Sequence, residues 1–85
     1  MAYRIEFTRK AERQFKSLPA DIQVRLKSKI DALAGNPRPH GSEKLSGEEN
    51  FYRIRSGDYR VVYSIQAQAL VVLVVKAGHR REVYR

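Results

Sequence analysis

Three arginines near the middle of the chain are spaced so that they can share one surface of a β-sheet. Arg53 and Arg55 are two residues apart, and side chains at that spacing on a β-strand point to the same side. If residues 56–59 form a four-residue loop, Arg60 on the next strand pairs with Arg55, and Val62 pairs with Arg53. Like charges that face each other destabilise a sheet, whereas guanidinium groups match phosphate oxygens in bidentate hydrogen bonds. The three arginines therefore indicate a phosphate-binding surface.

Both the proposed pairing of the two strands and the phosphate-binding role of the arginines have an alternative. A three-residue loop would place Arg60 opposite Ile54 and bury it, so the apolar pattern of the two strands favours the four-residue loop. The arginines also fit an ordinary exposed surface on which water and salt separate the charges. The hairpin sequence alone does not decide between a phosphate site and such a surface.

The segment after Gly78 supplies further groups that suit nucleic acid. Arg80 and Arg81 add positive charge, and Tyr84 offers a ring for base stacking and a hydroxyl donor. Histidine exchanges a proton near neutral pH, so His79 is a candidate acid or base. A structural role is the alternative for both rings: His79 bonded to the backbone, and Tyr84 anchoring the C-terminus.

A strand and two helices precede the arginines. Residues 1–7 alternate between apolar and polar side chains, which predicts a strand. Thr8 is a suitable N-cap for a helix that runs to about Leu18. A second helix begins at Pro19 and ends before Gly35, with one apolar stripe formed by Ile22, Leu26, Ile30 and Leu33. The two helices are expected to form a hairpin.

The sheet is expected to follow a long loop. Residues 35–50 are rich in Gly and Pro, and strands are predicted at 51–55, 59–66 and 70–77, with turns at 56–58 and 66–68 and Gly78 as the end of the last strand. The run from Leu70 to Val75 has no polar residue, so this strand should be central and buried on both faces. The predicted fold class is α+β, in the order β-α-α-β-β-β, with a helical hairpin on one face of a twisted, mainly antiparallel four-stranded sheet. Function then belongs to the other face.

Length and charge narrow the class of protein. The 85 residues carry 17 Lys and Arg against 9 Asp and Glu, a formal net charge of +8, which points to a polyanionic partner. This length predicts a single domain over residues 1–85. The absence of cysteine excludes a disulfide scaffold and thiolate metal sites. The longest apolar run, residues 69–75, is far shorter than the roughly 20 residues of a membrane span, so a cytoplasmic protein is expected.

Other chemistries find little support in the sequence. His40 and His79 are far apart and predict no metal site, and His40, between Pro39 and Gly41, is interpreted as an ordinary loop histidine. No Gly-rich phosphate loop occurs, and no serine is placed with a histidine and an aspartate. The apolar helix stripes belong to the core, so a membrane-surface helix is not expected.

Three segments and the element order carry a resemblance to a known family. The segments are Lys44-Leu45-Ser46-Gly47, the hairpin from Phe51 to Tyr63, and the ending Gly78-His79-Arg80-Arg81-Glu82-Val83-Tyr84. Together they resemble the RelE toxins, which belong to the RelE/ParE superfamily of bacterial and archaeal type II toxin–antitoxin systems. The resemblance covers essentially the whole chain. The Tyr-Arg-Val-Val-Tyr core is shared across the superfamily, whereas the ending is more specific to the RNA-cleaving branch.

The resemblance implies an mRNA interferase, an endoribonuclease that uses no metal and no cofactor. Such toxins cut mRNA in the ribosomal A site by attack of a ribose 2′-hydroxyl on the neighbouring phosphate, which releases a 5′-hydroxyl product and inhibits translation. By the same resemblance, Arg53 and Arg55 match basic positions, Arg60 binds phosphate, Arg80 serves the leaving group, and Tyr84 stacks on or orients the substrate. Further candidates for RNA contact are Lys44, Arg81 and Arg85.

The resemblance leaves the general base open. Arginine effectively never loses its proton, so Arg53 and Arg55 are poor bases, although their charge can stabilise a phosphorane. His79 is the remaining candidate acid or base.

The family also implies partners. We expect a cognate RelB-like antitoxin with an acidic segment, the ribosome and mRNA, operator DNA only through the antitoxin complex, and no membrane. Two alternatives remain: a ParE-like inhibitor of DNA gyrase, and a noncatalytic RNA- or DNA-binding module, for which the charge alone suffices.

Overall fold

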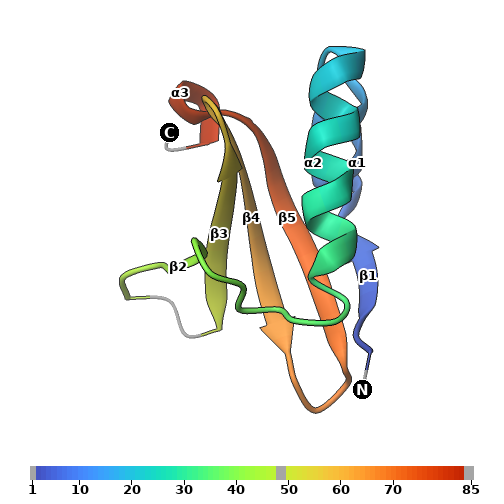
Figure 1. Cartoon of the computed structure of the whole chain (residues 1–85), viewed down its shortest axis with the longest axis vertical. Helices are drawn as coiled ribbons and strands as arrows, with labels where there is room; N and C mark the ends of the chain where they lie inside the picture. The colour runs from blue at the N-terminus through green and yellow to red at the C-terminus, as the bar shows by residue number, and fades with distance from the viewer. Residues whose placement is uncertain (1, 48–49, 84–85) are drawn as a thin grey trace.

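The two long helices lie on one side of a twisted sheet, as Figure 1 shows. The computed structural model describes residues 2–47 and 50–83. Their elements are β1 (Arg4–Phe7), α1 (Arg9–Lys16), α2 (Ala20–Ala32), β2 (Glu43–Lys44), β3 (Phe51–Ser56), β4 (Tyr59–Gln66), β5 (Val71–His79) and α3 (Arg80–Val83). The predicted α+β class is confirmed, with α1 and α2 covering one face. We call the opposite face of the sheet the open face.

The sheet has five strands in the order β1-β5-β4-β3-β2, so the prediction of four strands was wrong. β1 pairs with β5 in parallel, and the other pairs are antiparallel. The additional strand, β2, lies inside the segment predicted as a loop and pairs Glu43 with Arg53 and Lys44 with Tyr52. Two residues are too few to show the alternation from which a strand is recognised.

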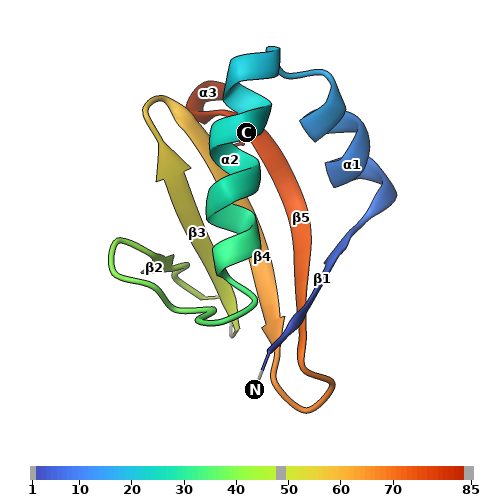
Figure 2. The ribbon, with the colours of Figure 1, turned by 45° about the vertical axis from the view of Figure 1, so that its right-hand side comes forward.

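Local signals in the sequence account for the two long helices. The Thr8 side chain accepts a hydrogen bond from the backbone N–H of Ala11 at 3.1 Å, which confirms it as the N-cap of α1. The helix ends at Lys16 rather than at Leu18, because the chain turns at Ser17. Figure 2 shows that α1 and α2 diverge, so each packs mainly on the sheet rather than along the other.

The core lies between the sheet and the helices. Its strand residues include the predicted set Ile54, Val61, Tyr63 and Ile65, and its helix residues include Leu26, Ile30 and Leu33. Each large apolar side chain buried in this way stabilises the fold by about 1.5–3 kcal/mol relative to leaving it exposed. The core therefore fixes which face of β3 and β4 points toward the helices and which points outward.

The boundaries and burial of β5 differ from those predicted. The strand starts at Val71 because Leu70 has a φ of 55°, a turn conformation. It does not end at Gly78 but continues to His79, because β4 extends to Tyr59 and pairs with it. β5 lies between two strands as expected, yet Leu73 and Val75 are only half-buried, because α1 and α2 leave the open face uncovered.

Candidate nucleic-acid interface

The three central arginines share the open face. Arg55 pairs with Arg60 and Arg53 pairs with Val62, which is the predicted register. Ser56 also pairs with Tyr59, so the turn itself consists of Gly57 and Asp58 only. We call Arg53, Arg55 and Arg60 the arginine cluster.

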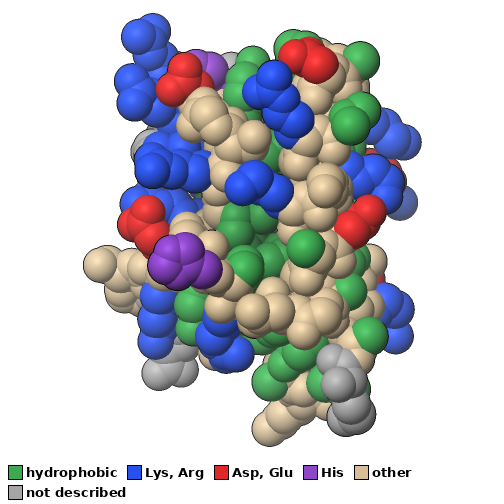
Figure 3. Space-filling view, in the orientation of Figure 1, with side chains coloured by type: hydrophobic (Ala, Val, Ile, Leu, Met, Phe, Trp, Pro, Cys, Tyr) green, Lys and Arg blue, Asp and Glu red, His purple; other side chains and the backbone are tan. Residues whose placement is uncertain are grey.

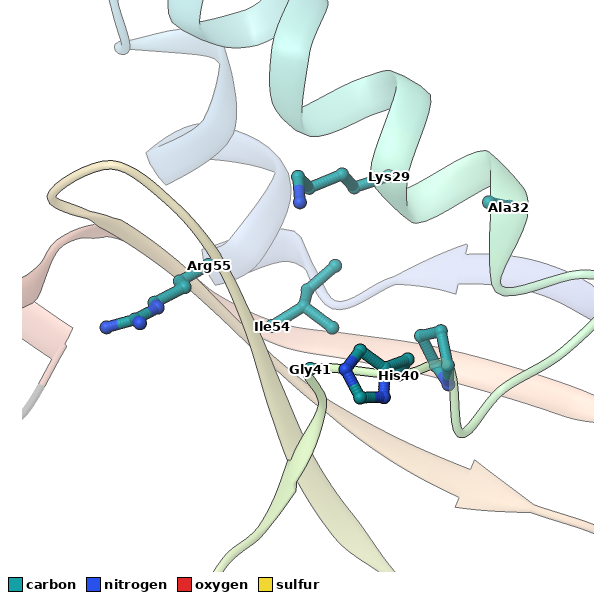
Figure 4. Close-up of a pocket in the computed structure, with 7 residues that line it drawn as sticks. Lys29, Ala32, His40, Gly41, Ile54 and Arg55 are labelled. Carbon is teal, nitrogen blue, oxygen red and sulfur yellow. The ribbon is translucent and has the colours of Figure 1, made fainter.

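Neighbouring groups hold two members of the arginine cluster in place. Arg53 forms an ion pair with Glu43 of β2, with 2.9 Å between Nη2 and Oε2, and its side chain is only 26% exposed. Arg60 donates from Nη1 to the carbonyl oxygen of Gly57 at 3.3 Å. Arg55 is exposed, and Figure 4 shows its side chain and that of Ile54 leaving β3 in different directions. The guanidiniums are thus attached to a hairpin whose other face is locked into the core.

Lys76 of β5 is a fourth cation on the open face, and sequence reasoning missed it. The register pairs Val62 with Lys76, so Arg53, Val62 and Lys76 form one row across three strands. A β-bulge lies here, because Tyr63, the next residue after Val62, pairs with Val74 rather than with Val75. Strict alternation from Val72 and Val74 would send Lys76 toward the core, and the extra residue of a bulge reverses that direction.

The turn of the hairpin holds the start of α3. The backbone N–H of Arg80 donates to the carbonyl oxygen of Asp58 at 2.8 Å, so Arg80 begins its helix beside the tip of β3 and β4. Arg80 and Arg81 are both exposed. In Figure 3, in the same orientation as Figure 1, Lys and Arg side chains gather at the upper left, over α3 and β3 and away from α1 and α2. The structure thus brings Arg80 to the end of the sheet that carries Arg55 and Arg60.

His79 does not join the arginine cluster in this structure. The pairing of β4 with β5 places His79 opposite Tyr59. Tyr59 is two residues from the core residue Val61, so both lie on the same face of β4. The rings of Tyr59 and His79 meet edge to face, with 5.5 Å between their centroids. The His79 Nδ1 accepts a hydrogen bond from the backbone N–H of Arg81 at 3.3 Å. This contact with the backbone is the structural alternative described above, and a role for His79 as acid or base stays a prediction.

The remaining candidates lie elsewhere or outside the description. Lys44 is exposed and pairs with Tyr52. Tyr52 is two residues from Ile54, so it lies on the core face of β3, and Lys44 lies on that same face of the sheet. Lys44 is therefore on the opposite face from the arginine cluster. Tyr84 and Arg85 lie outside the described residues, so their roles stay predictions.

Two tyrosines fasten the loop before β2 to the sheet. The Tyr63 hydroxyl donates to the carbonyl oxygen of Pro37 at 2.7 Å, and burial raises the pKa of Tyr63 to about 12, although a hydrogen bond with Ser42 acts the other way. Arg38 lies over the Tyr52 ring, 5.4 Å from its centroid, and donates from Nε to the Tyr52 hydroxyl at 3.1 Å, which raises the pKa of Arg38. These contacts fix the path of the chain into Glu43.

A groove runs between this loop, α2 and β3. Its volume is about 260 Å³, and Figure 4 shows the residues that line it: Lys29, Ala32, Pro39, His40, Gly41, Ile54 and Arg55. His40 is exposed at this groove. Arg55 therefore borders both the groove and the open face.

The described part of the chain has neither a candidate metal site nor a candidate membrane-spanning helix. Within residues 2–47 and 50–83, no group of three or more His, Cys, Asp or Glu residues is placed to hold a metal ion. None of the helices in that part of the chain has the length and apolar character needed to cross a membrane.

Comparison with known proteins identifies the family. Residues 5–84 match the family model described as the ParE toxin of the type II toxin–antitoxin system parDE. The mRNA interferase toxin RelE of Escherichia coli K12 is 34% identical over 88 residues, covering 99% of this chain and 92% of the relative. The chain belongs to the RelE/ParE superfamily of type II toxins.

Solved structures of this superfamily share the fold. The isolated E. coli RelE toxin superposes with a TM-score of 0.85 at 31% identity, covering 98% of this chain and 92% of that one. The toxin in the archaeal RelE–RelB complex from Pyrococcus horikoshii OT3 gives a TM-score of 0.81 at 32% identity, covering 94% and 97%. The resemblance noted in the sequence is therefore confirmed over nearly the whole chain.

Proposed function

We propose that this chain is a RelE-type toxin, a single toxin domain over residues 1–85 that inhibits translation by cleaving mRNA. The reaction is metal-independent attack of a ribose 2′-hydroxyl on the adjacent phosphate. The proposal is supported by the similarity to a relative named mRNA interferase toxin RelE. The observation that carries it is the position of Arg53, Arg55 and Arg60 on one face, with Arg80 beginning beside the same hairpin.

The arginines account for the chemistry that this reaction needs from the protein. A phosphodiester gains negative charge as the 2′-oxygen attacks, and fixed guanidinium groups stabilise that charge where water is displaced. Arg53, Arg55 and Arg60 would bind the phosphate oxygens, and Arg80 would stabilise the leaving 5′-oxygen. Lys44, Arg81 and Arg85 would bind the flanking RNA, and Tyr84 would stack on a base.

The partners follow from the same proposal. The structures of relatives include a RelE–RelB complex, and we propose a RelB-like antitoxin whose acidic segment neutralises this basic face. Ribosome-bound mRNA in the A site is the proposed substrate, which places the activity in the cytoplasm. Operator DNA would be bound only through the complex with the antitoxin.

Cleavage on translating ribosomes tests the proposal. Purified protein is added to ribosomes stalled on a defined mRNA, and the 5′-hydroxyl ends are mapped. Arg60→Ala and Arg80→Ala should each lower the cleavage rate by roughly 10²–10³-fold, because each removes a charge that stabilises the transition state. The matched control is Arg25→Ala, an exposed arginine of α2 on the other side of the sheet, which should cleave at the normal rate. Equal rates for all three variants would refute the site.

A second candidate function is inhibition of DNA gyrase. The matching family model is described by the ParE name, and fold alone does not separate the two activities. A supercoiling assay with gyrase decides this point: inhibition without RNA cleavage would favour the ParE-like function. Binding to RNA with neither activity would instead indicate a noncatalytic binding module.

A further inference from the structure

We infer that Glu43 is the group that accepts the proton of the attacking 2′-hydroxyl, an inference that rests on the proposed ribonuclease function. Sequence reasoning left this role open, because arginine effectively cannot act as a base. Glu43 lay in a segment predicted as a loop, so its position next to the arginines became known only from the pairing of β2 with β3.

The contacts of Glu43 place it in the arginine cluster. It lies directly opposite Arg53 on the open face, and its Oε2 accepts a hydrogen bond from the Arg53 Nη2 at 2.9 Å. The Glu43 side chain is 59% exposed, whereas that of Arg53 is 26% exposed. The arginine thus orients the carboxylate from the protein side while the carboxylate stays accessible to a ligand.

The spacing of the sheet lets one nucleotide reach both Glu43 and the phosphate-binding arginines. Glu43 is opposite Arg53 on β3, Arg53 is opposite Val62 on β4, and Arg60 is two residues from Val62 along β4. Ordinary strand spacings then place the Cα atoms of Glu43 and Arg60 about 12 Å apart. Arg53 and Arg55 of β3 lie between these two positions, opposite Glu43 and Arg60 respectively. A phosphate bound by Arg53 and Arg55 would therefore have its ribose within reach of Glu43.

Among the described residues, the other charged groups on this side of the sheet are mainly cations: Lys76 on β5, and Arg80 and Arg81 on α3. Asp58 carries a carboxylate in the turn beyond the Arg55–Arg60 pair, at the end of the hairpin away from Glu43. Glu6 is also on the open face, but it lies on β1 and pairs with Arg4, three strands away from β3. The nearby loop contributes His40, which lines the groove behind β3. Among the described residues, Glu43 is therefore the carboxylate that contacts the arginine cluster.

The proposed step balances as follows. The 2′-O–H bond breaks and its proton passes to a carboxylate oxygen of Glu43, while the 2′-oxygen forms a bond to phosphorus. The bond from phosphorus to the 5′-oxygen then breaks, and that oxygen takes a proton from water, giving a 2′,3′-cyclic phosphate and a 5′-hydroxyl end. Glu43 returns its proton to solvent. The guanidinium of Arg53 donates to the same carboxylate and orients it.

Three variants test the inference in one assay on ribosome-bound mRNA, with the cleavage rate measured as a function of pH. Glu43→Gln keeps the shape and an acceptor for Arg53 but cannot take the proton, so its rate should fall by roughly 10²–10³-fold. The decrease in cleavage rate at acidic pH, which we call the acidic limb of the pH profile, should be absent in this variant. Glu43→Asp should retain the limb at a reduced rate, and the control Glu6→Gln should match the unmodified protein. Thermal unfolding confirms that each variant is folded.

The outcomes separate this inference from the proposed function. If the unmodified protein cleaves and Glu43→Gln cleaves within threefold of it, or cleaves faster, Glu43 is not the proton acceptor and only balances the charge of Arg53. A slow Glu43→Gln that keeps the acidic limb points to a positioning role and also refutes the inference. If the unmodified protein cleaves no RNA, the proposed function fails, and the inference fails with it.

Discussion

Arg55 of β3 and Arg60 of β4 lie directly opposite each other on the open face of the sheet. Side chains in such positions have Cβ atoms about 4.5–5.5 Å apart, close enough for like charges to destabilise the pair. Folding by itself does not favour this arrangement, whereas a phosphate bound between the two guanidiniums does. The pair is therefore the feature of the fold that most directly indicates an anionic ligand.

Replacing one member of this pair should stabilise the free protein. Arg55→Gln removes the repulsion and keeps a long polar side chain, so we expect the free energy of unfolding to rise by about 0.2–1 kcal/mol. The gain should shrink as salt is added, because salt screens the repulsion between exposed charges. Urea denaturation at low and high salt measures both effects. Arg25→Gln on α2 is the control, and a loss of stability in Arg55→Gln would show that Arg55 makes a favourable contact that outweighs the repulsion.

Lys76 should contribute to RNA binding through its charge. Each Lys or Arg that neutralises a phosphate of single-stranded RNA adds about 0.7 to the slope of log affinity against log salt concentration. Lys76→Met should therefore lower that slope by about 0.7, as measured by fluorescence titration with a short RNA at several salt concentrations. Lys10→Met, on the exposed side of α1, should leave the slope unchanged. An unchanged slope for Lys76→Met would place Lys76 outside the RNA path.

The hydrogen bond from Tyr63 to Pro37 should contribute measurably to the free energy of unfolding. Tyr63 is fully buried and donates to the Pro37 carbonyl at 2.7 Å. Tyr63→Phe leaves that carbonyl oxygen without its donor, so it should lower the free energy of unfolding by about 1–3 kcal/mol at neutral pH. Urea denaturation measures the loss, and an unchanged stability would mean that water replaces the hydroxyl.

The same residue should make stability depend on pH in the alkaline range. Burial raises the pKa of Tyr63 to about 12, so the folded protein holds this proton more tightly than the unfolded chain does. The resulting stability is fully present below the unfolded pKa of about 10 and is lost as pH rises through the folded value. The stability difference between the unmodified protein and Tyr63→Phe should therefore shrink from pH 9 to pH 11.5. A constant difference over that range would contradict the raised pKa.

The turn between β3 and β4 should tolerate a side chain only at the cost of backbone strain. Gly57 has a φ of 60°, and a Cβ added there would meet no atom within 4 Å. Gly57→Ala should thus lower stability by about 1–2 kcal/mol for conformational reasons alone. Gly57→Asn should cost less, because asparagine adopts this conformation more readily. Thermal unfolding of the two variants gives the comparison, and equal stability of Gly57→Ala and the unmodified protein would contradict it.

Much of the fold was determined by the sequence itself. The apolar stripe of α2, the Thr8 cap and the alternation around Ile54 and Val61 depend on local periodicity, so they predicted the helices, the hairpin and its register. The arginine cluster followed from the same alternation, because side chains two residues apart share a face. The short segments that resemble RelE toxins identified the superfamily for the same reason: they are continuous in sequence.

Only the tertiary structure decided which other charges surround the arginines. Glu43 contacts Arg53 because it lies on a two-residue strand, and Lys76 lies on the open face because of a β-bulge. Neither a two-residue strand nor a bulge produces a hydrophobic periodicity that can be recognised in the sequence. His79, next to Arg80 in sequence, turns to Tyr59 because the ladder of β4 and β5 continues one residue past Gly78. Pairing between distant strands sets these positions, so spacing along the chain does not determine them.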